Sequence, residues 1–262
     1  MSSLESAIRI LHCLSPETPH LRVSELAQRL NIPKSTVSRL LRTLSDGGVL
    51  DRNENTKEYA AGPVALQLGG LYMARHDLLH LVDEAVRKLV ERFGFTGYVA
   101  VLDRAEAVVL RCREGGYPVK FLLEVGTRQP AAEAALGIGL LARLNEAELR
   151  QVLEAPRYDD SYIHPPVETT LGWISEFRRQ GWVEVPCVSA PEIAAIGSVV
   201  DTPPGGQQAI GFSLSFPVSA ADAAIRQLMA TQIREVALEL SSIATSVSAP
   251  FAGRPGARYK AM

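Results

Sequence analysis

The sequence predicts an α+β chain in which a small helical domain is joined by a helix to a larger domain of mixed strands and helices. Short helical patterns and a hairpin pattern fill the first 63 of 262 residues, and strand-like and helix-like segments mix from residue 94 onward. Apolar residues make up 47% and charged residues 21% of the chain. That composition is typical of an ordinary globular protein and excludes a fibrous or disordered one.

Two short helices are expected at the start of the chain. Apolar residues at helical spacing predict the first over residues 6–14, and the prolines that follow end it. The second is expected over residues 25–30, with Val23 or Ser24 near its cap. Asn31, Ile32 and Pro33 then form a tight turn.

A third helix is expected over residues 34–44, where Pro33 suits the first helical position because its missing N–H has no partner there. One apolar face is formed by the i, i+3, i+4 and i+7 residues Val37, Leu40, Leu41 and Leu44. The opposite face carries no acid before Asp46 and consists of Lys34, Ser35, Ser38, Arg39 and Arg42.

A hairpin pattern follows this helix. Gly47 and Gly48 end the helix, and residues 49–52 and 59–61 then flank a polar turn over residues 53–57. Two helices joined by a short turn and followed by a hairpin have the layout of a winged helix-turn-helix, whose second helix enters the major groove of DNA.

A basic helix face taken alone is more often a solvated surface than a DNA contact. The turn, the acid-free face, the glycine break and the hairpin occur here in the expected order, and this combination favours DNA binding. Contact with base edges or nearby phosphates is assigned to Ser35, Thr36, Ser38 and Arg39. Phosphate contact is assigned to Arg22, Lys34 and Arg42, and contact of the wing with the backbone or minor groove to Arg52 and Lys57.

The remainder of the chain alternates between helix and strand patterns. Helical periodicity covers residues 64–73 and 78–93, as a linker helix leading into a longer one. Strands are predicted at 96–102, 107–111, 119–125, 182–188, 196–201 and 209–217, and helices at 131–144, 146–153, 168–180 and 220–247. We expect four parts: a DNA-binding domain 1–63, a linker helix 64–77, an α+β sheet domain 78–249 and a flexible, weakly basic tail 250–262.

Several segments resemble the IclR-type transcriptional regulators. Residues 22–41 closely resemble the DNA-binding domain of that family, and so do residues 7–11, 59–63 and 66–69. Looser resemblance to the family's effector domain covers residues 126–142, 180–182, 195–199 and 209–217. The resemblance implies a GAF-like effector domain, small organic acids or aromatic catabolites as effectors, and homodimers or homotetramers that bind near-palindromic operators in double-stranded DNA.

Carried over by position, the resemblance implies an effector pocket formed by Phe121, Ala135, Leu136, Ile193, Ala195, Ser213 and Ser215. The residues themselves add an argument, because Ser213 and Ser215 lie two apart on a strand and direct both hydroxyls to one face. Such hydroxyls can hold a carboxylate or hydroxyl of a ligand, and the helix start near Ala135 offers free N–H groups to an anion. Alternatively, both serines have local partners or face solvent.

The chain departs from the family pattern at this pocket. The family often has His and a polar residue where Ala132 and Ala134 stand, and Lys where Ile138 stands. The acidic cluster usual after residue 182 is replaced by the apolar run 185–188. These changes predict an effector that is larger or more aromatic than a two- or three-carbon keto acid.

Other chemistry finds little support in the sequence. The three cysteines are widely spaced and predict neither a disulfide framework nor a zinc site. His76 and His80 could share a helix face, but no third ligand accompanies them, so we expect no metal and no cofactor. No spacing supports an acyl-transfer enzyme using Cys112 or Cys187. A C-terminal domain that only oligomerises remains the alternative to a ligand sensor.

The net charge and the apolar stretches of the chain indicate which partners and which location to expect. Net charge is −2, which does not exclude DNA binding because local charge decides it. The first residues lack the basic start and apolar run of a signal peptide, and no stretch approaches the roughly 20 apolar residues needed to cross a bilayer. We therefore expect a cytoplasmic protein that does not contact membranes.

Overall fold

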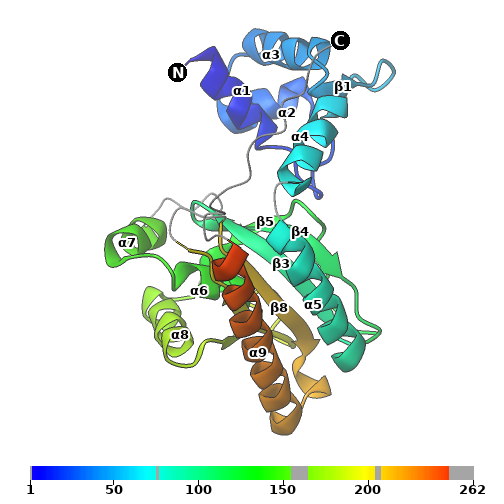
Figure 1. Cartoon of the computed structure of the whole chain (residues 1–262). Coiled ribbons are helices and arrows are strands. Elements are labelled where there is room, and N and C mark those ends of the chain that lie inside the picture. The colour runs from blue at the N-terminus through cyan, green and yellow to red at the C-terminus, as the bar shows by residue number, and fades with distance from the viewer. Residues whose placement is uncertain (1, 75–76, 155–164, 204–207, 248–262) are drawn as a thin grey trace, which may run out of the picture.

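A computed structural model describes residues 2–74, 77–154, 165–203 and 208–247 of the chain. The small domain consists of three helices and a hairpin (Figure 1), namely α1 (Ser3–Leu11), α2 (Val23–Leu30), α3 (Lys34–Asp46), β1 (Leu50–Arg52) and β2 (Tyr59–Ala61). The hairpin is antiparallel, with Asp51 opposite Ala60. The chain before α2 also bonds to the hairpin, because the backbones of Leu21 and Tyr59 exchange two hydrogen bonds.

One apolar core holds the small domain together. The buried face of α3 packs against α1, α2 and β1 through side chains that include Ile10, Leu26, Val37, Leu41 and Leu50. Because each helix is short, burial of these faces rather than helix propensity stabilises the domain. The core therefore fixes which face of α3 points outward.

Two helices join the small domain to the sheet. The linker helix α4 (Pro63–Ala74) has no buried residue, whereas α5 (Asp77–Phe93) buries Leu79, Val82 and Val86. Apolar residues recur at helical spacing through residues 71–93, a pattern that also suits pairing between helices. In the structure the α5 part of that spacing packs on the protein's own sheet.

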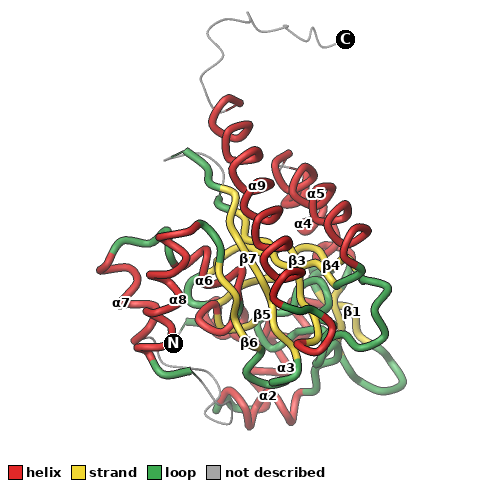
Figure 2. Tube along the Cα trace, turned by 90° about the horizontal axis from the view of Figure 1, so that it is seen from below, coloured by secondary structure: helices red, strands yellow, loops and turns green. Residues whose placement is uncertain are grey.

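The larger domain is built on a six-stranded antiparallel sheet of order β5-β4-β3-β8-β7-β6. Its strands are β3 (Thr96–Asp103), β4 (Glu106–Arg113), β5 (Arg128–Pro130), β6 (Val183–Pro186), β7 (Ile193–Val200) and β8 (Ile210–Pro217). Helices α5 and α9 (Ala223–Val247) lie side by side on one face (Figure 2). The other face carries α6 (Ala135–Leu141) and α8 (Val167–Gln180), and α7 (Glu146–Glu154) lies on the same side (Figure 1).

The predicted fold class, with its winged helix-turn-helix followed by an α+β domain, is confirmed. One predicted strand is wrong, because residues 119–125 form neither strand nor helix. The backbone of Phe121 and Leu123 bonds to the side chain of Tyr98 and does not pair with a neighbouring strand. The short edge strand β5 was not predicted.

Two predicted helices start later than expected. The helix predicted over residues 131–144 is interrupted at Ala134, whose backbone is extended, so a 3₁₀ turn (Ala131–Glu133) precedes α6. The C-terminal helix begins at Ala223 after a second 3₁₀ turn (Val218–Ala220). The predicted tail over residues 250–262 lies outside the described residues.

Candidate DNA interface and effector pocket

The turn between α2 and α3 is set by its backbone. Asn31 adopts the left-handed conformation (φ 53°) that ends α2, and this conformation is tolerated by asparagine better than by most residues. Pro33 is the N-cap residue of α3. It therefore lies one position before the first helical position, where the sequence predicted it. Its carbonyl accepts the backbone N–H groups of Thr36 at 2.9 Å and Val37 at 3.1 Å. The cap of α2 is Arg22, and not Val23 or Ser24, which are the first two residues of the helix.

The outer face of α3 carries the predicted DNA contacts together. Val37, Leu40 and Leu41 are buried, and five of the six predicted residues on this helix are exposed, namely Lys34, Ser35, Ser38, Arg39 and Arg42. Thr36 is half-buried. The three cations form no ion pair with any residue that the structure describes. Figure 1 shows α3 on the side of the small domain away from the sheet, so the face is open to a large partner.

The other three predicted cations are held by acids in the free protein. Arg22 forms an ion pair with Glu58 at 2.6 Å, and a second, longer one with Glu25 at 3.8 Å. On the wing, Glu54 pairs with Arg52 at 3.4 Å and with Lys57 at 3.1 Å. These wing groups are exposed, so DNA phosphates could replace the carboxylate at low cost.

The seven predicted effector residues all line one pocket on the α6 face of the sheet. The pocket contains about 440 Å³ of space free of protein atoms, part of it open to solvent. Its lining also includes Ala134, Val185 and Cys187, at positions where the chain departs from the family pattern, and five residues that the sequence argument missed: Tyr98, Leu123, Gln129, Glu133 and Ala194. Most of the lining is apolar, and the described lining residues include no Lys, Arg or His.

Ser213 and Ser215 bring two hydroxyls to the pocket from β8. They alternate with Phe212, Leu214 and Phe216, which are buried on the opposite face of the sheet. The side chain of neither serine has a hydrogen-bond partner within the described residues. Because hydroxyls that remain unpaired in a largely apolar pocket are costly, they are suited to a ligand's polar group.

Glycines let α6 approach the sheet closely. A methyl group added at Gly197 of β7 would lie 2.7 Å from the backbone nitrogen of Leu136, and one at Gly211 of β8 would lie 2.8 Å from the Leu136 carbonyl oxygen. Both distances are shorter than side chains tolerate. The start of α6, with the pocket residues Ala135 and Leu136, is therefore placed by the absence of side chains on the two strands.

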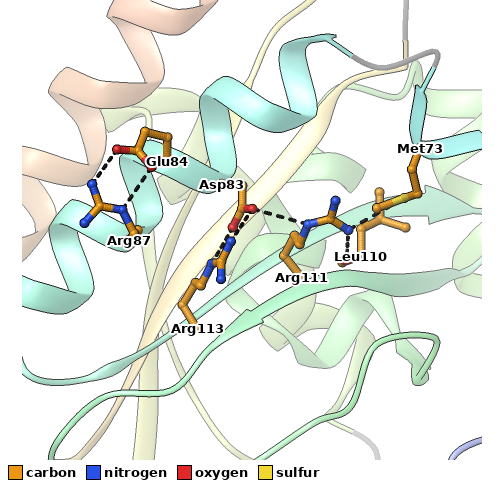
Figure 3. Close-up of polar contacts among 7 residues, drawn as sticks. All are labelled: Met73, Asp83, Glu84, Arg87, Leu110, Arg111 and Arg113. Carbon is orange, nitrogen blue, oxygen red and sulfur yellow. Dashed lines mark hydrogen bonds and ion pairs between the residues drawn. The ribbon is translucent and has the colours of Figure 1, made fainter. Parts of the chain in front are cut away.

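The opposite face of the sheet carries a charge cluster around the buried Asp83 (Figure 3). Asp83 of α5 accepts hydrogen bonds from Arg113 at 2.7 and 2.6 Å and from Arg111 at 3.3 Å. Arg111 also contacts the sulfur of Met73 in the linker helix and the carbonyl of Leu110. The cluster thus ties β4 of the sheet to both α5 and α4.

Metal sites, membrane-spanning helices and a reactive cysteine find little support among the described residues. No group of three potential metal ligands occurs among the described residues, and His76 lies outside them. Within those residues no helix is long and apolar enough to cross a membrane. Burial is the main cause that raises the pKa of the Cys112 thiol, which disfavours the thiolate that a cysteine nucleophile needs.

Comparison with known proteins identifies the same two domains. The model of the IclR helix-turn-helix domain matches residues 3–54, and the model of the C-terminal domain of bacterial IclR regulators matches residues 70–242. The chain is 27% identical over 203 residues to the transcriptional regulator XynR of Escherichia coli, covering 73% of this chain and 80% of XynR.

Solved structures share the fold across nearly the whole chain. An IclR family regulator from Brucella abortus matches with a TM-score of 0.77 and 20% identity, covering 93% of this chain and 92% of that one. An IclR homologue from Microbacterium hydrocarbonoxydans, complexed with 4-hydroxybenzoate, matches with a TM-score of 0.73 and 20% identity, covering 93% and 99%. With both domain models matched in order, the chain belongs to the IclR family of DNA-binding transcriptional regulators.

Proposed function

We propose that α3 and the wing bind an operator in double-stranded DNA, and that a small organic effector in the α6-face pocket changes the operator affinity. The DNA-binding role is proposed for residues 1–63, the linker role for 64–77 and the sensing role for 78–249. The observation that carries the DNA part is the outer face of α3, where cations without ion-pair partners in the described chain stand beside free hydroxyls. Operator DNA and these regulators share the cytoplasm, where we infer that the protein acts.

Specific residues take separate roles in this proposal. Base edges or nearby phosphates are contacted by Ser35, Thr36, Ser38 and Arg39. Phosphates are the main contacts of Lys34, Arg42 and Arg22, and Arg52 and Lys57 hold the wing against the backbone or minor groove. Phosphate contacts supply affinity that falls with salt, and base contacts supply sequence choice. A gel shift with the promoter beside the protein's own gene tests the operator.

The effector is proposed to be an aromatic catabolite, with or without a carboxylate. The largely apolar pocket lining, including Val185 and Ala134, supports a ring-sized ligand, and the hydroxyls of Ser213 and Ser215 support a polar substituent. The related Microbacterium protein with 4-hydroxybenzoate supports the same class. Isothermal calorimetry should rank aromatic acids above pyruvate and glyoxylate, and the reverse order would contradict the proposal.

The serines can be tested with a matched control. Ser213→Ala should weaken binding of an aromatic acid by about 1 kcal/mol or more, because it removes one hydrogen-bonding group from the pocket. Ser219→Ala changes an exposed serine in the 3₁₀ turn before α9 and should leave binding unchanged. Equal binding by the parent and both variants would remove Ser213 from the site.

A homodimer or homotetramer is proposed from the linker helix. Helix α4 has no buried residue, and Leu66, Leu68 and Leu71 are 80%, 59% and 57% exposed. Several large apolar side chains exposed on one helix are typical of an interface, even though these three are spread around the helix and not on one face. Replacing Leu66 and Leu71 with Glu should lower the mass measured by light scattering, whereas Leu238→Glu on α9 serves as the charge control. An unchanged mass would contradict this interface.

The exposed leucines also favour the second candidate function, a C-terminal domain that only oligomerises. A thermal-shift screen separates the two functions, since an effector at 100 times its Kd stabilises the folded state by about 2.7 kcal/mol. If no compound both stabilises the folded protein and alters its operator affinity, the result favours a domain that only oligomerises.

A further inference from the structure

The pocket is bordered by a segment that has no regular secondary structure. Residues 118–125, called the strap below, run along the pocket between two backbone anchors on the sheet domain. At one end, the N–H of Tyr117 donates to the carbonyl of Gly94 at 3.0 Å. At the other end, the N–H of Gly126 donates to the carbonyl of Val109 at 2.8 Å. The strap itself bonds to the sheet differently.

One side chain of the sheet fastens the middle of the strap, next to Lys120 of the strap, which forms an ion pair with Glu114 at 2.7 Å and donates to the carbonyl of Gly115 at 3.2 Å. The hydroxyl of Tyr98, on β3, donates to the carbonyl of Phe121 and accepts the N–H of Leu123 at 3.2 Å. Among the residues that the structure describes, no other group of the sheet forms a hydrogen bond with the strap. Tyr98 is only 3% exposed, and burial raises the pKa of its hydroxyl, so the proton that it donates is retained at neutral pH.

The two bonds fix which strap side chains face the pocket. Phe121 and Leu123 line it, whereas Leu122 between them is 50% exposed. The bonded backbone groups belong to residues 121 and 123 themselves. The tyrosine therefore sets how far these two residues lie from the sheet and which side chains of the strap form the pocket wall. Tyr98 also pairs in register with Ser213, so the fastening point lies beside a proposed ligand contact.

We propose that Tyr98 is a positioning residue for the effector, whose hydroxyl holds the strap so that Phe121 and Leu123 form one wall of the pocket. An effector enters and leaves when these two hydrogen bonds open, and its shape must fit the wall that they define. The inference rests on the proposed function of the pocket, and it adds the residue that controls its size and its exchange rate.

Replacing Tyr98 with Phe keeps the ring in the core and removes both hydrogen bonds. Hydrogen exchange followed by NMR or mass spectrometry should show the amide of Leu123 exchanging about tenfold or more faster, as expected for the loss of bonds worth roughly 1 kcal/mol each. The amide of Gly126 should be unaffected, because its acceptor is a backbone carbonyl. Tyr117→Phe is the matched control, since no hydrogen bond of its hydroxyl occurs in the described structure.

The consequence for ligand binding is measured with 4-hydroxybenzoate as the probe. In stopped-flow experiments Tyr98→Phe should release the probe about tenfold faster than the parent, while Tyr117→Phe should release it at the parental rate. Phe121→Ala removes the wall itself and should lower the affinity. Parental release by Tyr98→Phe would overturn the positioning role.

The two hypotheses fail in different ways. If Leu123 exchanges equally in the parent and Tyr98→Phe, the strap is not held by the tyrosine and the inference is wrong, whatever the pocket binds. If exchange rises as expected but the parent does not bind 4-hydroxybenzoate even at millimolar concentration, the structural role of Tyr98 stands and the proposed aromatic effector fails.

Discussion

Arg113 of β4 donates two hydrogen bonds, at 2.7 and 2.6 Å, to the carboxylate of Asp83 of α5, on the face of the sheet opposite the pocket. The side chain of Asp83 is 8% exposed, and that of Arg113 is 43% exposed. The same carboxylate also accepts from Arg111, which reaches the linker helix at Met73. The pair therefore fixes α5 on the sheet near the junction with the DNA-binding half.

Asp83→Asn should destabilise the protein by about 1–2 kcal/mol, because two partly exposed arginines then face a neutral group in place of the buried carboxylate. Glu84→Gln is the matched control one residue along the helix. Glu84 pairs with Arg87 at the surface, so its change should leave the free energy of unfolding close to that of the parent. Urea denaturation measures both, and equal costs would contradict the assignment of the buried pair.

The close approach of α6 to the sheet gives a second prediction. Gly197→Ala places a methyl group against the Leu136 backbone and should destabilise the protein by about 1–3 kcal/mol. The same change should lower the affinity for aromatic ligands, because it displaces the start of α6. Gly172→Ala in α8 meets no atom within 4 Å and should stabilise by about 0.5–1 kcal/mol. Thermal unfolding distinguishes the two, and a neutral Gly197→Ala would mean that α6 can move away freely.

The partner of Arg22 gives a third prediction. The hydrogen bond from Arg22 is the largest of the causes that lower the pKa of Glu58, so this carboxylate stays charged down to low pH. Glu58→Gln should strengthen operator binding by about threefold at low salt, because it frees the guanidinium for a phosphate. Glu168→Gln makes the same charge change in α8 and serves as the control. Weaker binding by Glu58→Gln would mean that the pair positions Arg22 on DNA.

Asp201 predicts a pH effect on stability. Burial raises the pKa of its carboxyl above the ordinary value of 3.8, and the nearby Arg143 opposes this rise. Between 3.8 and the higher folded value, the folded state binds the proton more tightly than the unfolded state. The free energy of unfolding contributed by this group therefore falls as pH rises through that window. Asp201→Asn should remove this fall in the free energy of unfolding, measured by urea denaturation between pH 4 and 6. If the free energies of the parent and the variant change in parallel with pH, the prediction is wrong.

The sequence was sufficient wherever one repeating pattern decided the structure. The spacing of Val37, Leu40 and Leu41 determined which face of α3 is buried, and the alternation around Ser213 determined which face of β8 meets the pocket. In both cases each residue's environment follows from its neighbours three, four or two positions away.

Features that depend on distant partners could not be predicted in this way. The strand expected at residues 119–125 has the right residue types, but its backbone meets the hydroxyl of Tyr98, about 25 residues earlier in the chain. The pairing of Arg22 with Glu58 likewise needs the hairpin to fold back toward α2. Local spacing carries no information about either contact.

The direct test of the account is the operator affinity of Arg39→Ala, measured by fluorescence anisotropy over a range of salt concentrations. Arg39 is exposed on α3 and lacks an ion-pair partner among the described residues. Its loss should weaken binding by about 1–3 kcal/mol, whereas Arg92→Ala in the sheet domain should not. If Arg39→Ala binds the operator as tightly as the parent at moderate salt, α3 is not the helix that contacts DNA.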